Sequence, residues 1–339
     1  MRLAPGMFEK APKVAYVFKK ISRQANIGFA KRTFRLIFVP ESPSPTMAAA
    51  DPAAPGSPDP TAAEPSVRPP PRFDAHGLSA AAIDRLAEDG DFVAALGRGL
   101  AVLLALSDKR RRMSIAQVSH QTGIARATVR RSLHTLVRLG FVAVDEARRF
   151  YLRPRVLSFS HAYLSASPIA VLSQPILDRL GESLREACSL ATLDDDEIVY
   201  LARSATSRVM SPFLNVGRRL PAYCTSIGRV MLAHLPPDAL DRYLASVRPV
   251  PYTEYTTTDV GELRAMLAKV RETGYAYASQ QMELRLCTLA VPVRDTGGQV
   301  VAGINVILQN RLVPVDEMSA RFLVPLQQAA LELGSALLP

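Results

Sequence analysis

Arginine spacing gives this sequence its clearest chemical signal. Between residues 126 and 139, arginine and histidine side chains alternate with an apolar series that recurs every three or four residues. That pattern is typical of an amphipathic helix with one basic face. An α-helix fits the major groove of duplex DNA, and arginine can donate two parallel hydrogen bonds to the edge of a guanine. The spacing therefore favours contact with double-stranded DNA.

We expect these contacts to come from the outward positions of this helix and from a basic turn that follows it. The predicted DNA-binding residues are Arg126, Ala127, Thr128, Arg130, Arg131, His134, Arg148 and Arg149. The alternative is a charged helix face that is only solvated, which is the ordinary role of a run of charges. The neighbouring elements decide between these two interpretations.

Two further helices are predicted before the basic helix. The apolar face of the first, at residues 92–106, consists of Val93, Leu96, Leu100, Leu103 and Leu104. Solvated charge at residues 107–112 ends it. The second helix begins at Ser114, a natural N-cap, and ends near Gly123, which supplies the left-handed backbone of a tight turn. Ala125 stands where the basic helix would ordinarily have a capping Ser or Thr, and this costs about 1 kcal/mol of local stability.

A β-hairpin is predicted after the basic helix. Its strands are residues 141–144 and 150–152, and the turn at residues 145–149 is basic. A helix, a glycine turn, a basic helix and a hairpin in this order are typical of a winged helix-turn-helix domain, which we place at residues 91–154. The order favours DNA binding over a solvated face.

The net charge of +10 is unevenly distributed along the chain. Residues 91–155 carry +9 and residues 156–339 carry −2, while residues 1–46 carry +7 and residues 47–90 carry −4. A basic module beside a near-neutral one is typical of a nucleic-acid-binding domain joined to a domain with another task.

Residues 1–90 are predicted to be a disordered or wrongly started extension. Residues 1–46 place Lys and Arg between apolar residues, as a targeting or membrane-surface segment does. Alternatively they lie upstream of the true start, which would be Met47. Residues 40–72 are rich in Pro, Ala and Ser and are expected to lack helix and sheet. Residues 78–89 show only a weak helical pattern.

Other classes of function find little support. Cys188, Cys224 and Cys287 form no CxxC pair, which argues against a disulfide framework and for a reducing cytoplasm. No apolar run reaches the length of about 18 residues that a membrane span needs. No HExxH, GxSxG or glycine-rich phosphate loop appears, and His234 lies too far along its predicted helix from Cys224 for a nucleophile–base pair. We expect a cytoplasmic protein that is not an enzyme, with no membrane partner and no cofactor.

Residues 155–339 are predicted to form an α+β domain around an antiparallel sheet, after a linker helix at residues 155–167. Further helices are predicted at residues 168–187, 224–235, 238–244, 262–273 and 315–338. Strands are predicted at residues 189–193, 198–202, 210–215, 275–279, 288–293 and 300–308. The acidic turn at residues 194–197 has no histidine or second carboxylate cluster to complete a metal site, so a solvated turn is favoured and no metal is expected.

Several segments match one known pattern. The clearest is Arg-Arg-Leu-Pro-Ala-Tyr-Cys-Thr-Ser-Ile-Gly-Arg at residues 218–229. The others are Asp-Phe-Val at 91–93 with Arg-Gly-Leu at 98–100, Pro-Arg-Val-Leu at 154–157, His-Ala-Tyr-Leu at 161–164 and Leu-Ala-Val-Pro-Val at 289–293. Together they resemble the IclR family of bacterial transcription regulators, especially the subgroup of the β-ketoadipate pathway with its 4-hydroxybenzoate and protocatechuate branches. The resemblance covers residues 91–335. It implies a GAF-like effector-binding domain at residues 168–339, homodimers or homotetramers, and control of a catabolic operon.

The resemblance also implies an effector pocket between the sheet and residues 222–229, with a contribution from residues 279–288. Hydroxyls and free backbone N–H groups ahead of the predicted apolar helix suit a carboxylate, although a plain N-cap is the alternative for Ser226. The predicted effector-binding residues are Tyr223, Cys224, Thr225, Ser226, Ser279, Gln280, Cys287 and Thr288.

One segment departs from the subgroup. Its pattern Asp-Gln-Glu-x-Glu-x-Gly-x-Arg-Ser is replaced by Ser-Gln-Gln-Met-Glu-Leu-Arg-Leu-Cys-Thr at residues 279–288, so two acids, a glycine and an arginine are missing and Arg285 is new. The anion that binds is expected to change with them. The sequence thus favours a DNA-binding regulator controlled by a small carboxylate effector. The alternative is a regulator of the same fold whose C-terminal domain serves only dimerisation.

Overall fold

The computed structural model describes residues 78–107, 112–204 and 215–337. The segments predicted at residues 1–46 and 40–72 lie outside the described residues, as does nearly all of the strand predicted at 210–215.

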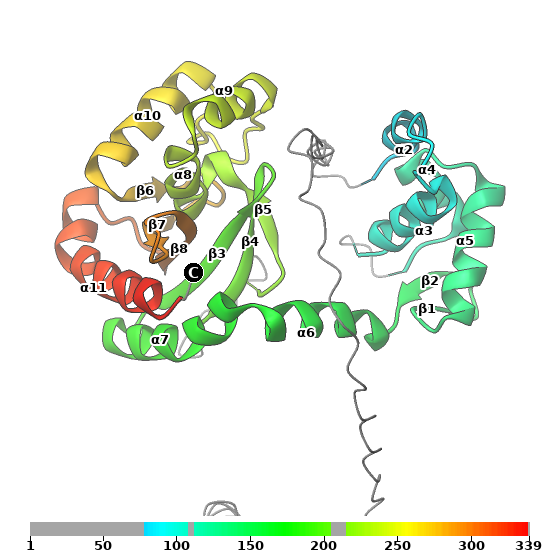
Figure 1. Cartoon of the computed structure of the whole chain (residues 1–339), viewed down its shortest axis with the longest axis horizontal. Helices are drawn as coiled ribbons and strands as arrows, with labels where there is room; N and C mark the ends of the chain where they lie inside the picture. Colours follow the sequence, from blue (N-terminus) through cyan, green and yellow to red (C-terminus); the bar gives the residue numbers. More distant parts are fainter. Residues whose placement is uncertain (1–77, 108–111, 205–214, 338–339) are drawn as a thin grey trace, which may run out of the picture. The chain divides into compact units, whose positions relative to one another are not determined.

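The first group of elements is a winged helix-turn-helix, here called the winged-helix module (residues 78–156). Its elements are α2 (Ala80–Leu86), α3 (Ala94–Ala105), α4 (Ile115–Thr122), α5 (Arg126–Arg138), β1 (Val142–Val144) and β2 (Phe150–Leu152) (Figure 1). The predicted helices and hairpin are confirmed. Helix α2 also belongs to this core, because Ile83 packs fully buried among residues of α3, α4 and α5. The module therefore begins before residue 91.

Local chemistry explains where these helices begin and end. Ser114 Oγ accepts a hydrogen bond from Gln117 N at 3.3 Å, and Gln117 Oε1 accepts one from Ser114 N at 2.9 Å, which makes a capping box at the start of α4. Gly123 ends α4 with φ 71°. Helix α5 starts after Ala125 without a side-chain cap, as the sequence predicted.

Helix α3 places most of its predicted apolar face outward, and only Leu103 of that set packs partly against the core. Val93 and Leu96 are each 62% exposed, and Leu100 and Leu104 are 46% and 48% exposed. The buried positions of α3 are instead Gly97, Ala101, Val102 and Ala105. Mostly small side chains on that face allow α3 to approach α5 closely, so the large residues are left on the opposite side.

A short connection leads out of the module. It consists of η1 (Pro154–Val156), α6 (Leu157–Ala166) and α7 (Pro168–Leu184). The rings of Phe141, just before β1, and Phe159 on α6 stack with centroids 5.5 Å apart, and the Arg155 guanidinium lies 5.3 Å from the centre of the Phe141 ring.

Among the described residues no single helix is long and apolar enough to cross a membrane. The η1–α6 and α7 segments pass that test only jointly, and the chain bends by 82° between them.

The C-terminal domain (residues 168–337) contains one antiparallel sheet of six strands in the order β5-β4-β3-β8-β7-β6. The strands are β3 (Ala187–Asp194), β4 (Glu197–Arg203), β5 (Arg219–Pro221), β6 (Ala276–Ser279), β7 (Leu286–Arg294) and β8 (Val300–Gln309). The remaining elements are η2 (Ala222–Cys224), α8 (Ser226–Ala233), α9 (Pro237–Ser246), α10 (Val260–Thr273) and α11 (Val315–Ala336). This confirms the predicted α+β class, and β5 is an addition to it.

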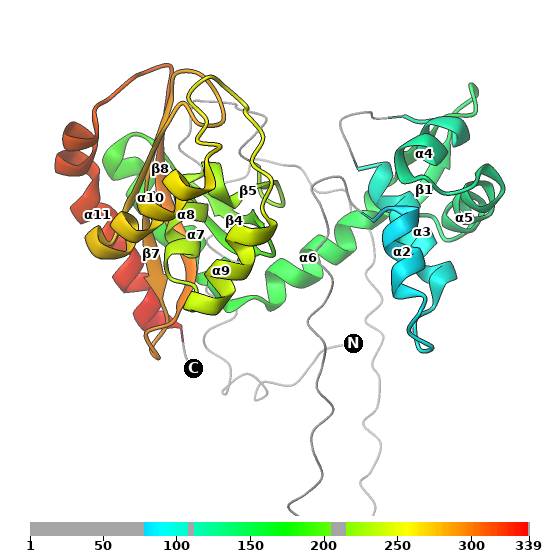
Figure 2. The same cartoon turned by 90° about the horizontal axis from the view of Figure 1, so that it is seen from above.

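Helices cover both faces of this sheet (Figures 1 and 2). Helices α7 and α11 bury one face, where Leu190, Leu289 and Phe322 share one core. Helices α8, α9 and α10 cover the other, where Tyr200 and Ile227 belong to a second core. Successive residues of a strand point to opposite faces, so parity along each strand decides which core a side chain enters.

Candidate functional site

The outward face of α5 carries the predicted DNA-binding side chains. Arg126, Ala127, Arg130, Arg131 and His134 are exposed and Thr128 is half-buried, while the opposite face is anchored by fully buried Val129 and Leu133. None of these arginines forms an ion pair within the part of the chain that the structure describes. Their guanidinium groups are therefore available to a partner.

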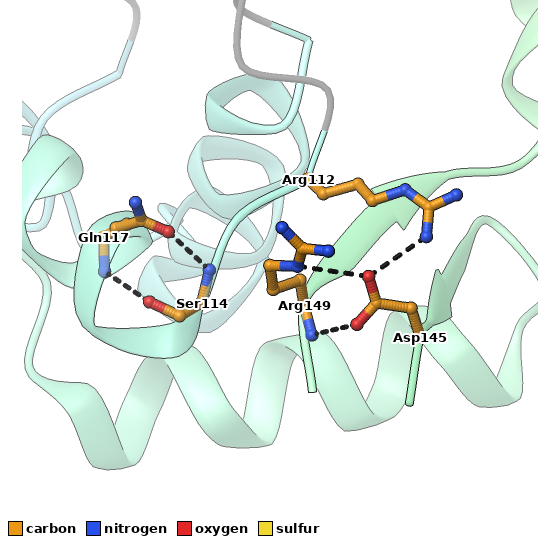
Figure 3. A network of polar contacts seen from close by, with 5 residues as sticks. All are labelled: Arg112, Ser114, Gln117, Asp145 and Arg149. Carbon is orange, nitrogen blue, oxygen red and sulfur yellow. Dashed lines mark hydrogen bonds and ion pairs between the residues drawn. The ribbon is translucent and has the colours of Figure 1, made fainter. Parts of the chain in front are cut away.

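The turn of the wing, residues 145–149, is organised by one carboxylate. Asp145 Oδ1 accepts a hydrogen bond from Arg149 N at 2.8 Å, and its Oδ2 accepts from Arg149 Nε at 3.2 Å and from Arg112 Nη1 at 3.0 Å (Figure 3). The backbone hydrogen bond from Arg149 holds the pKa of Asp145 below its usual range against the desolvation of the acid, with help from both guanidinium groups. Arg148, with φ 55°, is exposed beside them.

Sequence reasoning missed Arg112, which belongs to the stretch interpreted as solvated charge. Its guanidinium lies 4.7 Å from the centre of the Tyr151 ring as well as bonding to Asp145. The next residue, Met113, forms an isolated bridge with Phe150, with N–O distances of 3.0 and 2.7 Å. Only this pairing of distant segments reveals that residue 112 belongs to the wing.

In the C-terminal domain, η2 and the start of α8 bring Tyr223, Cys224, Thr225 and Ser226 together, all of them buried. Thr225 Oγ1 caps α8 by accepting from Gly228 N at 3.1 Å. A Cβ on Gly228 would lie 2.2 Å from the Ala222 carbonyl oxygen, so glycine permits η2 to fold back onto the helix.

Arg229 is a buried cation on α8, only 2% exposed. Its Nε donates to Tyr223 O at 2.8 Å and its Nη2 to Gln281 Oε1 at 2.7 Å. Gln281 in turn accepts from Thr257 N at 3.0 Å and donates to Tyr255 O at 2.7 Å. Burial lowers the pKa of Arg229 to about 10, although the nearby Cys224 and Glu262 oppose the shift. Neutral oxygens thus solvate this cation, and the 280–285 loop is fastened to α8 through it.

The α8 face of the sheet contains polar groups that the sequence did not single out. Ser189 on β3 lies opposite Asn305 on β8. By the strand register, Thr288 on β7 points to the same side of the sheet as these two residues. Ser189 Oγ, Asn305 Oδ1 and Ser226 Oγ are buried and have no hydrogen-bond partner among the described residues. Ser189 and Asn305 are each a lone polar residue in an apolar strand, so only the sheet register brings these two together, whereas Ser226 was among the predicted residues.

Two of the predicted effector-binding residues lie on the other face of the sheet. Cys287 packs in the core under α7 and α11, and Ser279 Oγ lies 3.5 Å from its sulfur. Because Cys287 and Thr288 are successive strand residues, only Thr288 faces α8. The structure therefore does not bring Ser279 and Cys287 together with Tyr223–Ser226.

The loop between β6 and β7 is shaped by unusual backbone. Gln280 has φ 55°, and its Oε1 accepts from Arg285 N at 3.1 Å. Arg285, which stands where the subgroup pattern has glycine, keeps a left-handed φ of 59°. Met282 of the same loop lies against Cys224, with 2.9 Å between the sulfurs. The loop therefore contacts the residues of η2.

Two of the four acids in the turn after β3 are paired with one arginine. Arg219 on β5 binds Asp194 at 2.5 Å and Glu197 at 2.6 Å. No group of three or more potential metal ligands occurs among the described residues.

Comparison with known proteins matches both parts of the chain. Residues 95–146 match the model of the IclR helix-turn-helix domain, and residues 161–335 match that of the bacterial transcriptional regulator IclR C-terminal domain. The chain is 45% identical to a Pca regulon regulatory protein of Pseudomonas putida, over 72% of this chain and 84% of the relative. It is 34% identical to a p-hydroxybenzoate hydroxylase transcriptional activator of Acinetobacter baylyi, over 72% and 91%. A solved transcriptional regulator of Rhodococcus sp. RHA1 is 37% identical with a TM-score of 0.63, covering 73% of this chain and 98% of that one.

Proposed function

The chain belongs to the IclR family of bacterial transcriptional regulators, and from this premise we propose that it controls an operon of aromatic-acid catabolism in response to a small carboxylate. It is a DNA-binding regulator and not an enzyme. The observation that carries the proposal is the similarity through both domains to relatives named for the Pca regulon and for p-hydroxybenzoate hydroxylase. The protein acts in the cytoplasm, where its promoter lies.

In this proposal α5 enters the major groove. Arg130 reads a base, and Arg126, Arg131 and His134 contact bases or phosphates around it, as their exposure and their lack of ion pairs with any described residue allow. Arg148 contacts the DNA backbone from the wing. Ala127 and Thr128, at the start of the helix, approach the base edges through their methyl groups.

The effector binds on the α8 face of the sheet. The unpartnered oxygens of Ser189, Asn305 and Ser226 support a polar ligand there, because a buried hydrogen-bonding group without a partner costs about 1–3 kcal/mol. The start of α8 suits a carboxylate. Further lining is proposed from Tyr223, Cys224, Thr225, Gln280 and Thr288.

Two exposed apolar faces support a second copy of the chain as partner. One is the outward face of α3, with Val93, Leu96, Leu100 and Leu104. The other is on α6, where Leu157, Phe159 and Tyr163 are 64%, 62% and 58% exposed. Clusters of exposed apolar side chains on one helix face are typical of association surfaces, and we propose a homodimer, with a homotetramer as its higher assembly.

The test combines DNA binding with calorimetry. Gel shifts on the promoter beside this gene are expected to show binding that 4-hydroxybenzoate, protocatechuate or β-ketoadipate alters. Isothermal titration with the same acids should give heat, and Asn305→Ala and Thr288→Val should weaken it. Ser279→Ala is the matched control, because its hydroxyl lies on the other sheet face. If none of the acids gives heat or alters the gel shift, a C-terminal domain that serves only dimerisation is favoured. If the protein does not shift the promoter at low salt, the regulator proposal is overturned.

A further inference from the structure

The wing contains a cluster in which only Arg149 belongs to the predicted DNA-binding residues. Arg112, from the chain just before α4, and Arg149, from the end of the wing turn, both bind the carboxylate of Asp145 (Figure 3). A hollow of 480 Å³ is lined by these three residues together with Val144, Glu146 and Ala147. An acid at this place is unexpected, because a carboxylate repels the phosphates of an approaching DNA duplex.

The different exposures of the three side chains explain how an acid can lie at this place. The Asp145 side chain is 12% exposed, whereas those of Arg112 and Arg149 are 49% and 52% exposed. The carboxylate therefore lies beneath the two guanidinium groups and the cations face solvent. The lining as a whole holds two arginines and two acids, because Glu146 is exposed beside them, so a phosphate must meet the guanidinium edges themselves and not a net positive charge.

Each arginine keeps donors to spare. A guanidinium has five N–H donors, and Arg149 uses Nε while Arg112 uses Nη1 in their bonds to Asp145. Both Nη atoms of Arg149, and Nε and Nη2 of Arg112, have no other hydrogen bond within residues 78–107, 112–204 and 215–337. The free edges suit an anion with several acceptor oxygens, and a phosphodiester is such an anion.

The cluster is also fixed to the rest of the wing. Arg112 lies over the Tyr151 ring, and Met113 pairs with Phe150. Asp145 O accepts from Arg148 N at 2.9 Å and Asp145 N donates to Arg149 O at 2.9 Å, which closes the turn. Side chains held in this way lose little further conformational entropy when they bind a ligand.

We propose that the hollow binds one phosphate of the DNA backbone through Arg112 and Arg149, and that Asp145 is the positioning residue that holds both guanidinium groups in place. The inference rests on the DNA-binding function proposed above. The proposal predicts that removing this acid weakens DNA binding. Charge alone predicts the opposite, because an acid repels the phosphates.

The experiment measures operator affinity by fluorescence anisotropy across a salt series, using the full-length chain. Asp145→Asn is expected to lower the affinity about tenfold, and Arg112→Ala is expected to reduce the slope of log K against log salt by about 0.9, the value for one phosphate contact. The control is Glu88→Gln, which removes an exposed acid of the same module that lies outside the lining of the hollow and has no ion pair with a described residue. It should leave binding unchanged or tighten it.

Several outcomes separate the explanations. If Asp145→Asn binds as tightly as Glu88→Gln or more tightly, the inference is overturned. A normal salt slope for Arg112→Ala overturns it as well, even if Asp145→Asn fails to fold. Thermal unfolding of each variant excludes a loss of binding caused by a melted wing. If Arg130→Ala also leaves affinity unchanged, the proposed DNA-binding surface itself is wrong, whereas an effect of Arg130→Ala alone rejects only the phosphate site.

Discussion

Helix α5 and the α8 face of the sheet hold their functional groups in opposite environments. The arginines of α5 are exposed and form no ion pair within the described chain. The groups around α8 are buried, and Arg229 alone links three segments through Tyr223 and Gln281. A surface that meets a charged polymer needs free cations, whereas a pocket that encloses a small molecule needs a framework that is already complete. The two regions should therefore respond differently to mutation.

The largest expected effect is on the buried region. Gly228→Ala places a Cβ 2.2 Å from a backbone oxygen, so we expect a loss of about 3 kcal/mol in the free energy of unfolding of the C-terminal domain, measured by urea denaturation. Gly99→Ala on α3 is the control, because a Cβ there meets nothing within 4 Å and removing a helical glycine stabilises by about 0.5–1 kcal/mol. Equal effects of the two changes would contradict the comparison.

On the exposed region the expected loss is in binding and not in stability. Arg130→Ala should cost about 1–3 kcal/mol at the cognate operator and much less on random DNA, as measured by anisotropy. Arg98→Ala removes the same charge from α3, where the guanidinium is bonded to Asp84, and should change operator affinity little. An equal loss on both kinds of DNA would reassign Arg130 to a phosphate.

Removing one neutral hydrogen-bond partner of Arg229 should also destabilise the C-terminal domain. Gln281→Ala deprives the Arg229 guanidinium of an acceptor, so we expect the free energy of unfolding to fall by about 2 kcal/mol. Gln327→Ala on the exposed side of α11 is the matched change and should stay within about 0.5 kcal/mol. A stable Gln281→Ala variant would mean that water replaces the amide.

Substitutions at two helix N-caps of the winged-helix module should change its stability by smaller amounts and in opposite directions. Ser114→Ala breaks the capping box of α4 and is expected to cost about 1 kcal/mol, whereas Ala125→Ser supplies the cap that α5 lacks and should gain about 0.5–1 kcal/mol. Thermal unfolding of the two variants measures both changes. If Ala125→Ser bound the operator less well despite its stability, Ala125 would lie against DNA.

The smallest expected effect is a pH dependence at the wing. The folded-state pKa of Asp145 is depressed, so its contribution to stability is present above its unfolded pKa of about 4 and is lost as the pH falls through the lower folded value. The difference in Tm between wild type and Asp145→Asn should be present at about pH 6 and shrink below about pH 4. A difference that does not depend on pH would show that the ion pairs contribute nothing to folding.

The winged-helix module depends on local sequence patterns and the α8 face depends on contacts between distant segments, and this difference explains what the sequence could predict. The helix-turn-helix follows from local periodicity and from Gly123, and the α5 surface follows with it. Arg112 escaped notice because its partner lies 33 residues away. Ser279 and Cys287 were grouped with Thr288 because adjacent positions look alike until the strand register assigns them to opposite faces. Ser189 and Asn305 meet only through the pairing of β3 with β8.

The ring stack at the end of the module has a mechanical consequence. Phe141 and Phe159 lie 15° from parallel, and the Arg155 guanidinium lies over the Phe141 ring. Rotation of α6 about its own axis would break these ring contacts. The ring stack therefore fastens the first turn of α6 to the base of the hairpin, and replacing either ring by alanine would remove that attachment.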